Sequence, residues 1–148
     1  MKILLAVDGS KHSNFAARFL IQRLPWFRDV PKIDLVYVHR VLQPIGTLLG
    51  TPLSQQTVDS YYRDEAKTHL AEPRRLLLDA RLQFETRSLI GEAATEIQKF
   101  AESHQSDLIW IGSRGMGAIG NILLGSTATK ILHAAKIPVV VVPTDNFD

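Results

Sequence analysis

Four short apolar runs constrain this sequence most, because each predicts a buried strand. The runs occupy residues 3–7, 33–38, 108–111 and 137–142. They are continuous rather than alternating and rich in Ile and Val, which is typical of strands covered on both faces in a parallel sheet. Residues 83–90 alternate more between apolar and polar side chains, and this pattern predicts an edge strand.

The segments between these runs have apolar residues at intervals of three and four, which predicts helices. The first helix is expected to begin after Ser10 as N-cap and to end at Pro25, and others are expected over residues 93–101 and 128–135. Residues 54–80 are also helix-like, with a kink or interruption expected at Pro73. Strands that alternate with helices predict an α/β fold with a doubly wound parallel sheet and helices on both faces. No linker or repeat divides the chain, so we expect one domain over residues 1–148.

Composition excludes several classes of function. The formal net charge of +2 is small and the basic residues are scattered, which argues against a nucleic-acid partner. The chain has no cysteine, which excludes disulfides and thiolate metal sites. No apolar stretch is long enough for a signal peptide or a membrane helix. We therefore expect a cytoplasmic protein with no membrane partner.

A glycine-rich segment follows the third of the apolar runs. It extends from Gly112 to Ser126, holds five glycines and is almost uncharged. Ligands of open parallel sheets collect at the carboxyl ends of the strands. Glycines there can adopt positive φ and leave backbone N–H groups free to bind an anion, and Ser126 or Thr127 can cap the helix that follows. The pattern favours a phosphate site, with a flexible surface connection as the alternative.

Two familiar motifs overlap this segment. Gly115, Gly117 and Gly120 spell the dinucleotide fingerprint G-x-G-x-x-G, but they follow a late strand rather than opening a first βαβ unit. Gly120 and Gly125 imitate a phosphate-binding P-loop that lacks its lysine. We interpret the first match as accidental, and the missing lysine argues against rapid ATP hydrolysis.

The remaining polar residues offer no convincing catalytic set. Asp8 ends the first run and could bind ribose hydroxyls or a cation beside phosphates, or simply close the Asp8-Gly9 turn. Ser10 and Ser13 fit a helix start better than catalysis. The histidines show neither metal-site spacing nor a shared neighbourhood with acidic residues, and the pairs Asp64-Glu65 and Glu92-Glu96 resemble helix-surface charges. We therefore predict no catalytic residue and no protein metal site, apart from Asp8 beside a magnesium nucleotide.

Four glycine and hydroxyl positions carry a family resemblance. Gly112, Gly115, Gly125 and Ser126 match G-x2-G-x9-G-[ST], which resembles the ATP-binding branch of the universal stress protein family. The strand sequences KILLAVDGS, IDLVYVH, SDLIWIGSRG and KIPVVVVP agree with that family over nearly the whole chain. The resemblance implies five parallel strands in the order 3-2-1-4-5 and binding of ATP or a related adenine nucleotide.

The resemblance also implies a set of nucleotide-binding positions. Those near the base and ribose would be Ala6, Val7, Asp8, Arg40, Ile111 and Gly112, and those near the phosphates Gly115, Gly125, Ser126 and Thr127. Arg40 departs from the small apolar residue usual there, which puts the shape of the base pocket in question.

A homodimer is a further implication, with pairing through the last strand from Ile137 to Pro143. An uncharged strand edge invites pairing, and a monomer whose edge is blunted by Pro143 is the alternative. The expected function is a nucleotide-binding sensor or regulator of the stress response with slow or no hydrolysis. A weak ATPase or ATP-dependent enzyme, and a scaffold without nucleotide, remain the alternatives.

Overall fold

The sheet has five parallel strands, as the apolar runs predict. The computed structural model describes residues 1–42, 54–116 and 124–143. Its strands are β1 (Lys2–Val7), β2 (Lys32–His39), β3 (Phe84–Ile90), β4 (Leu108–Gly112) and β5 (Val139–Val142), in the order β3-β2-β1-β4-β5. Its helices are α1 (Lys11–Gln22), α2 (Gln55–Asp79), α3 (Ala93–Ser103) and α4 (Ser126–Ala134), with a short 3₁₀ helix, η1, at Leu24–Trp26. The predicted fold class and strand order are confirmed.

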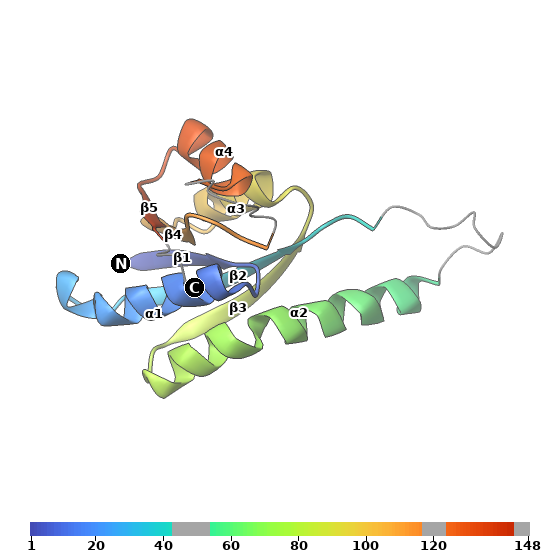
Figure 1. Ribbon diagram of the computed structural model, residues 1–148, viewed down its shortest axis with the longest axis horizontal. Helices are drawn as coiled ribbons and strands as arrows, with labels where there is room; N and C mark the ends of the chain where they lie inside the picture. Colours follow the sequence, from blue (N-terminus) through green and yellow to red (C-terminus); the bar gives the residue numbers. More distant parts are fainter. Residues whose placement is uncertain (43–53, 117–123, 144–148) are drawn as a thin grey trace.

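The helices cover the two faces of the sheet in pairs (Figure 1). Side chains of β1 alternate between the faces, so Leu5 packs in a core with Leu20 of α1 and Leu77 of α2. Leu4 packs on the opposite face with Ile97 of α3. Coverage on both sides explains why the strand sequences are continuously apolar.

Strand register brings the carboxyl ends of β1 and β4 together. Ala6 pairs with Ile111, and Val7 pairs with Tyr37 of β2. The residues that follow these strands therefore share one edge of the sheet, at the point where the strand order reverses, which is where ligands of such sheets bind.

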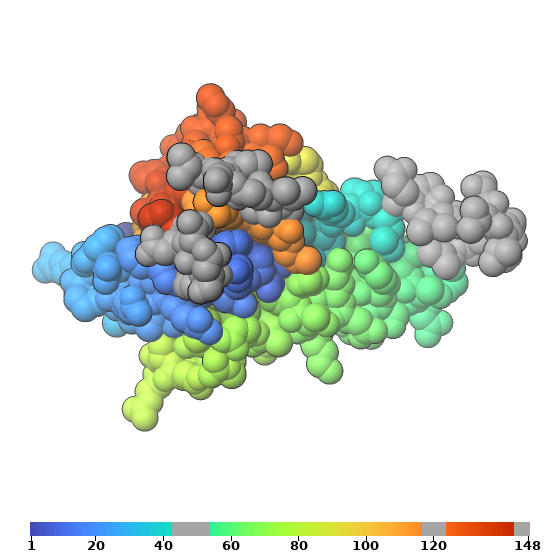
Figure 2. Space-filling view, in the orientation of Figure 1, coloured from blue at the N-terminus to red at the C-terminus, as the bar shows by residue number. Residues whose placement is uncertain are grey.

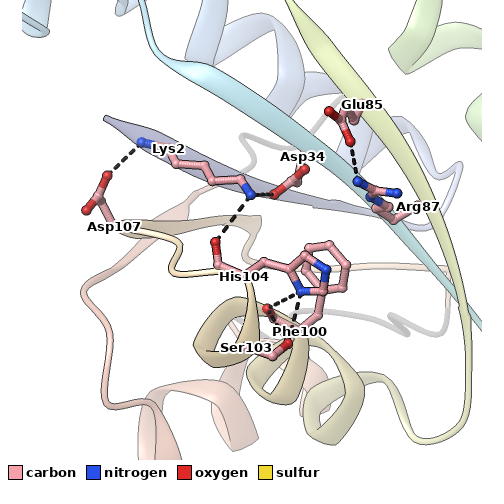
Figure 3. A network of polar contacts seen from close by, with 8 residues as sticks. All are labelled: Lys2, Asp34, Glu85, Arg87, Phe100, Ser103, His104 and Asp107. Carbon is pink, nitrogen blue, oxygen red and sulfur yellow. Dashed lines mark hydrogen bonds and ion pairs between the residues drawn. The ribbon is translucent and has the colours of Figure 1, made fainter.

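The amino end of the sheet carries an ion pair between β1 and β2 (Figure 3). The ammonium Nζ of Lys2 lies 3.0 Å from Oδ2 of Asp34, whose side chain is only 3% exposed. The same Nζ donates to the carbonyl of His104, and the Lys2 backbone N–H donates to Asp107. These contacts tie α3 and the start of β4 to the first two strands.

Three local expectations are wrong. The helix α2 continues without interruption through Pro73, whose side chain is buried. At α4 the N-cap is Gly125, without a side-chain cap, and Ser126 is already helical. Leu132, expected on the buried stripe of that helix, is 48% exposed. Within the described residues, no helix has the length and apolar character needed to cross a membrane.

Candidate functional site at the carboxyl edge of the sheet

Asp8, the first residue after β1, links two turns at the carboxyl edge. Its Oδ1 accepts the backbone N–H of Ser10 at 3.0 Å, which is the turn predicted for Asp8-Gly9. Its Oδ2 accepts the backbone N–H of Met116 at 2.7 Å. The carboxylate therefore closes its own turn and also holds the segment after β4, and Figure 2 shows the blue start of the chain beside that orange segment at the surface.

The described glycines of the motif lie where an added Cβ would clash or make a tight contact. A Cβ on Gly115 would meet Oδ2 of Asp8, and one on Gly125 would lie 3.3 Å from the carbonyl oxygen of Ser113. The N–H of Gly125 donates to that same carbonyl at 2.6 Å. The two ends of the glycine-rich segment are thus held together beside Asp8.

Close approach, rather than unusual backbone geometry, explains these glycines. We expected positive φ in the loop, but among the described glycines only Gly9 and Gly91 have it, at 80° and 153°. Gly125 has φ of −70°. Bare backbone suits both positions, because a Cβ at Gly115 would overlap the Asp8 carboxylate and one at Gly125 would make a tight contact with the Ser113 carbonyl. Gly117 and Gly120 of the two overlapping motifs lie outside the described residues.

Two basic residues, Lys11 and Arg114, lie close to this edge. Neither was among the predicted site residues. The pKa of His12 is lowered, first by burial and then by the positive charges of Lys11 and Arg114, while Asp8 opposes the effect. The imidazole is therefore neutral at pH 7, and the net charge beside Asp8 comes from the lysine and the arginine. The signal in the sequence was their position, Lys11 at the start of α1 shortly after β1 and Arg114 two residues after β4.

The predicted base and ribose positions are not equally accessible. Ala6, Val7 and Ile111 are buried, with exposures of 4%, 6% and 8%. Only their backbone can face a ligand at the edge. Arg40 is exposed, and its carbonyl accepts the hydroxyl of Tyr62 at 3.4 Å.

Residues of α4 complete the site. Ser126 is exposed and Thr127 is half-buried in the first turn. The first N–H groups of a helix have no partner within it, so they are available to an anion. The hydrogen bond from the Gly125 N–H to the Ser113 carbonyl holds this helix start close to the segment that Asp8 binds. No group of three or more metal-ligating side chains occurs in the described part of the chain.

A buried histidine near the same edge contradicts one expectation. His39, at the end of β2, is 1% exposed, and its Nδ1 lies 2.5 Å from Oε2 of Glu65 in α2. Its Nε2 lies 2.5 Å from Oγ of Ser88 in β3. Glu65 is therefore no simple surface charge, and a histidine does share its neighbourhood with an acid. The alternation over residues 83–90 placed Ser88 on one face of its strand, but no spacing in the sequence linked it to α2.

The comparison with family models decides the classification. The model of the universal stress protein family matches residues 1–143. The chain belongs to the universal stress protein family. A universal stress protein of Thermus aquaticus is 32% identical over 146 residues, covering 95% of this chain and 96% of that protein. One of Mycolicibacterium smegmatis is 33% identical over 154 residues, covering 97% of this chain, which spans about half (48%) of that relative.

Solved universal stress proteins share the fold. The structure of protein MJ0577 has a TM-score of 0.81 with 23% identity, covering 98% of this chain and 96% of that one. A universal stress protein in complex with cAMP has a TM-score of 0.72, 20% identity and coverage of 98% of both chains. An Arabidopsis thaliana member with AMP bound has a TM-score of 0.68, 16% identity and coverage of 99% and 93%. Identities below 25% support the fold alone.

Proposed function

We propose that this universal stress protein binds ATP or a related adenine nucleotide at the carboxyl edge and acts as a cytoplasmic sensor or regulator of the stress response. The observation that carries the proposal is the junction of Asp8, Gly115 and Met116, where bare backbone lies against a carboxylate beside the start of α4. Solved relatives that hold cAMP and AMP support the class of ligand.

The residues present suit a nucleotide. The phosphates would be held by the backbone of Gly115 and Gly125 and by Ser126 and Thr127, with positive charge from Lys11 and Arg114 nearby. Asp8 would face the ribose or an accompanying magnesium ion, and the backbone at Ala6, Val7, Arg40, Ile111 and Gly112 would border the base and ribose. The bound nucleotide would supply the phosphate charge that these groups recognise.

A direct test begins with the purified protein. After denaturation, released small molecules are identified by chromatography and mass spectrometry, and ATP and AMP are then titrated calorimetrically into stripped protein. We expect Gly115→Val to lower affinity at least about tenfold, because the branched side chain occupies the space against Asp8. Ala134→Val, at the exposed end of α4, is the control and should bind normally. An empty protein that binds no nucleotide at millimolar concentration would overturn the proposal in favour of a scaffold.

We also propose a homodimer that pairs through β5. The two edges of the sheet differ in chemistry, because β3 carries Glu85 and Arg87 whereas β5 consists of four valines. Charged side chains protect an edge strand from pairing, and their absence leaves β5 as the edge suited to a second copy.

A further inference from the structure

Ser88, His39 and Glu65 form a line of hydrogen-bonded side chains beside β3, the strand at one edge of the sheet. Ser88 is exposed, whereas His39 is 1% exposed and lies between Ser88 and Glu65. The distances are 2.5 Å from Oγ of Ser88 to Nε2 and 2.5 Å from Nδ1 to Oε2 of Glu65. The proposed nucleotide site uses none of these three side chains.

The hydrogen-bonding capacities give this line a defined direction when the imidazole is neutral. A carboxylate can only accept, so Nδ1 of His39 must donate to Glu65. In the neutral imidazole Nε2 is then an acceptor, and the hydroxyl of Ser88 donates to it. With a neutral imidazole the serine proton points at a base whose tautomer the carboxylate determines, which is the arrangement that activates a serine nucleophile.

Surrounding groups hold Glu65 in place. It accepts a hydrogen bond from the hydroxyl of Tyr37, and Tyr61, one helical turn earlier in α2, donates to its Oε1 at 3.5 Å. The rings of Tyr37 and Tyr62 lie 4.7 Å and 4.8 Å from that of His39. The imidazole is therefore fixed by contacts on several sides, the serine end of the line is open to solvent, and the Glu65 side chain is 24% exposed.

We propose that Ser88 is an activated nucleophile that accepts an acyl group from an activated ester, with His39 as general base and Glu65 as positioning residue. The Ser88 oxygen forms a bond to the carbonyl carbon while its proton passes to Nε2 of His39 and the carbonyl electron pair moves onto oxygen. When the carbonyl reforms, the alcohol or phenol leaves with that proton. Water then attacks the acyl-serine, giving one proton to His39 and releasing the acid, and the proton returns to Ser88.

The sheet edge offers partners for the developing oxyanion. Among the described residues β3 pairs with β2 alone, so its backbone N–H groups that point away from β2 have no strand partner there. Such N–H groups beside Ser88 can stabilise negative charge on the carbonyl oxygen.

A second serine–histidine contact provides an internal control. Ser103 is also exposed, and its Oγ lies 2.9 Å from Nδ1 of His104. Its hydroxyl donates to the carbonyl of Phe100 at 3.2 Å, and Nδ1 of His104 faces that carbonyl too, at 3.1 Å (Figure 3). This pair has no carboxylate behind the histidine among the described residues, so Ser103 should be an ordinary serine.

The test uses an alkyl fluorophosphonate, which phosphonylates activated serines, and p-nitrophenyl acetate as the acyl donor. We expect labelling at Ser88 by peptide mass spectrometry and a burst of about one p-nitrophenolate per chain. Ser88→Ala should abolish both, Ser103→Ala should change neither, and His39→Gln should slow labelling at least about 100-fold. Glu65→Gln should lower the maximal rate of labelling about tenfold or more while leaving the half-saturating probe concentration unchanged.

A further variant guards against loss of folding in His39→Gln. The chain has no cysteine, so Ser88→Cys and Ser60→Cys each provide a single thiol, the latter on exposed α2 away from any histidine contact in the described residues. Alkylation by iodoacetamide at pH 7 should be at least about tenfold faster at Ser88→Cys. Equal rates at the two thiols, or labelling that persists in Ser88→Ala, would show that the line of residues only stabilises the fold. Neither of these labelling results depends on whether the protein binds a nucleotide.

Discussion

The carboxylate of Asp8 accepts the backbone N–H of Met116, 108 residues further along the chain, at 2.7 Å. This contact joins the end of β1 to the segment after β4 without any side chain from that segment. A backbone donor suits the role because it remains with any residue except proline at 116, whereas the neighbouring Gly115 has no such freedom. The carboxylate and the glycine therefore form one structural unit.

Gly115→Ala should destabilise the protein, and Asp8→Ala should relieve much of that cost. Among the described residues, the added Cβ meets the Asp8 carboxylate alone within 4 Å, so the clash there depends on that side chain. We expect Gly115→Ala to lower the free energy of unfolding by about 1–3 kcal/mol in the wild-type background, and clearly less in Asp8→Ala. Urea unfolding of the four proteins measures the difference. Equal costs in both backgrounds would contradict the assignment of the clash.

The pair of Lys2 and Asp34 should show strong energetic coupling. Removing the lysine leaves a carboxylate with 3% exposure without its cation. We therefore expect Lys2→Met to cost about 3 kcal/mol of unfolding free energy, and the double variant with Asp34→Leu to cost less than the sum of the two single changes.

An exposed ion pair provides the comparison for this double-mutant cycle. Lys99 and Glu96 lie 3.1 Å apart on α3, with the lysine 69% exposed. Their coupling should be at most about 0.5 kcal/mol, because water screens the charges. If the two cycles gave the same coupling, burial of Asp34 would have no energetic consequence.

The sequence predicts the sheet well because burial on both faces leaves a local signal. Four strands lie within two residues of the apolar runs, β3 lies within one residue of the alternating segment 83–90, and the N-cap at Ser10 accepts the N–H of Ser13 as expected. The last strand begins at Val139, later than the run, because Pro138 has no N–H to donate, although its carbonyl accepts from Ile109.

The candidate site was only partly predictable. Position after a strand was enough to single out Asp8 and the glycines, because every parallel strand ends at the same edge. The contact of His39 with Glu65 and Ser88 depends on how α2 lies across β2 and β3, and sequence spacing carries no information on that packing. Likewise, α2 runs through the buried Pro73 although local propensity predicts an interruption there.

The edge strand β5, which consists of four valines, should determine the oligomeric state. If β5 pairs with a second copy, Val140→Lys places a charge at the interface and should weaken association at least about tenfold in sedimentation equilibrium. Thr86→Lys on β3, at the opposite edge of the sheet, should leave association unchanged. A wild-type protein that sediments as a monomer at every concentration would contradict pairing through β5.

Glu92 should make stability depend on pH in the acidic range. Its carboxylate caps α3, accepting the N–H and the hydroxyl of Thr95 at 2.8 Å each, and it pairs with Lys130 at 3.0 Å. These hydrogen bonds, first that from the Thr95 backbone, lower the pKa of Glu92 from 4.5 to about 2. The group therefore stabilises the fold above pH 4.5, and this contribution is lost as the pH falls toward 2.

Glu92→Gln should thus cost about 1 kcal/mol of unfolding free energy at pH 7, since the side chain is 49% exposed and water screens its charge. The difference between wild type and variant should shrink between pH 4.5 and pH 2, as measured by urea unfolding at each pH. Glu102→Gln, whose carboxylate faces Lys136 at 3.5 Å without capping a helix, serves as the control and should have a smaller effect at pH 7. A Glu92→Gln cost that stays constant down to pH 2 would show that the cap acts without its charge.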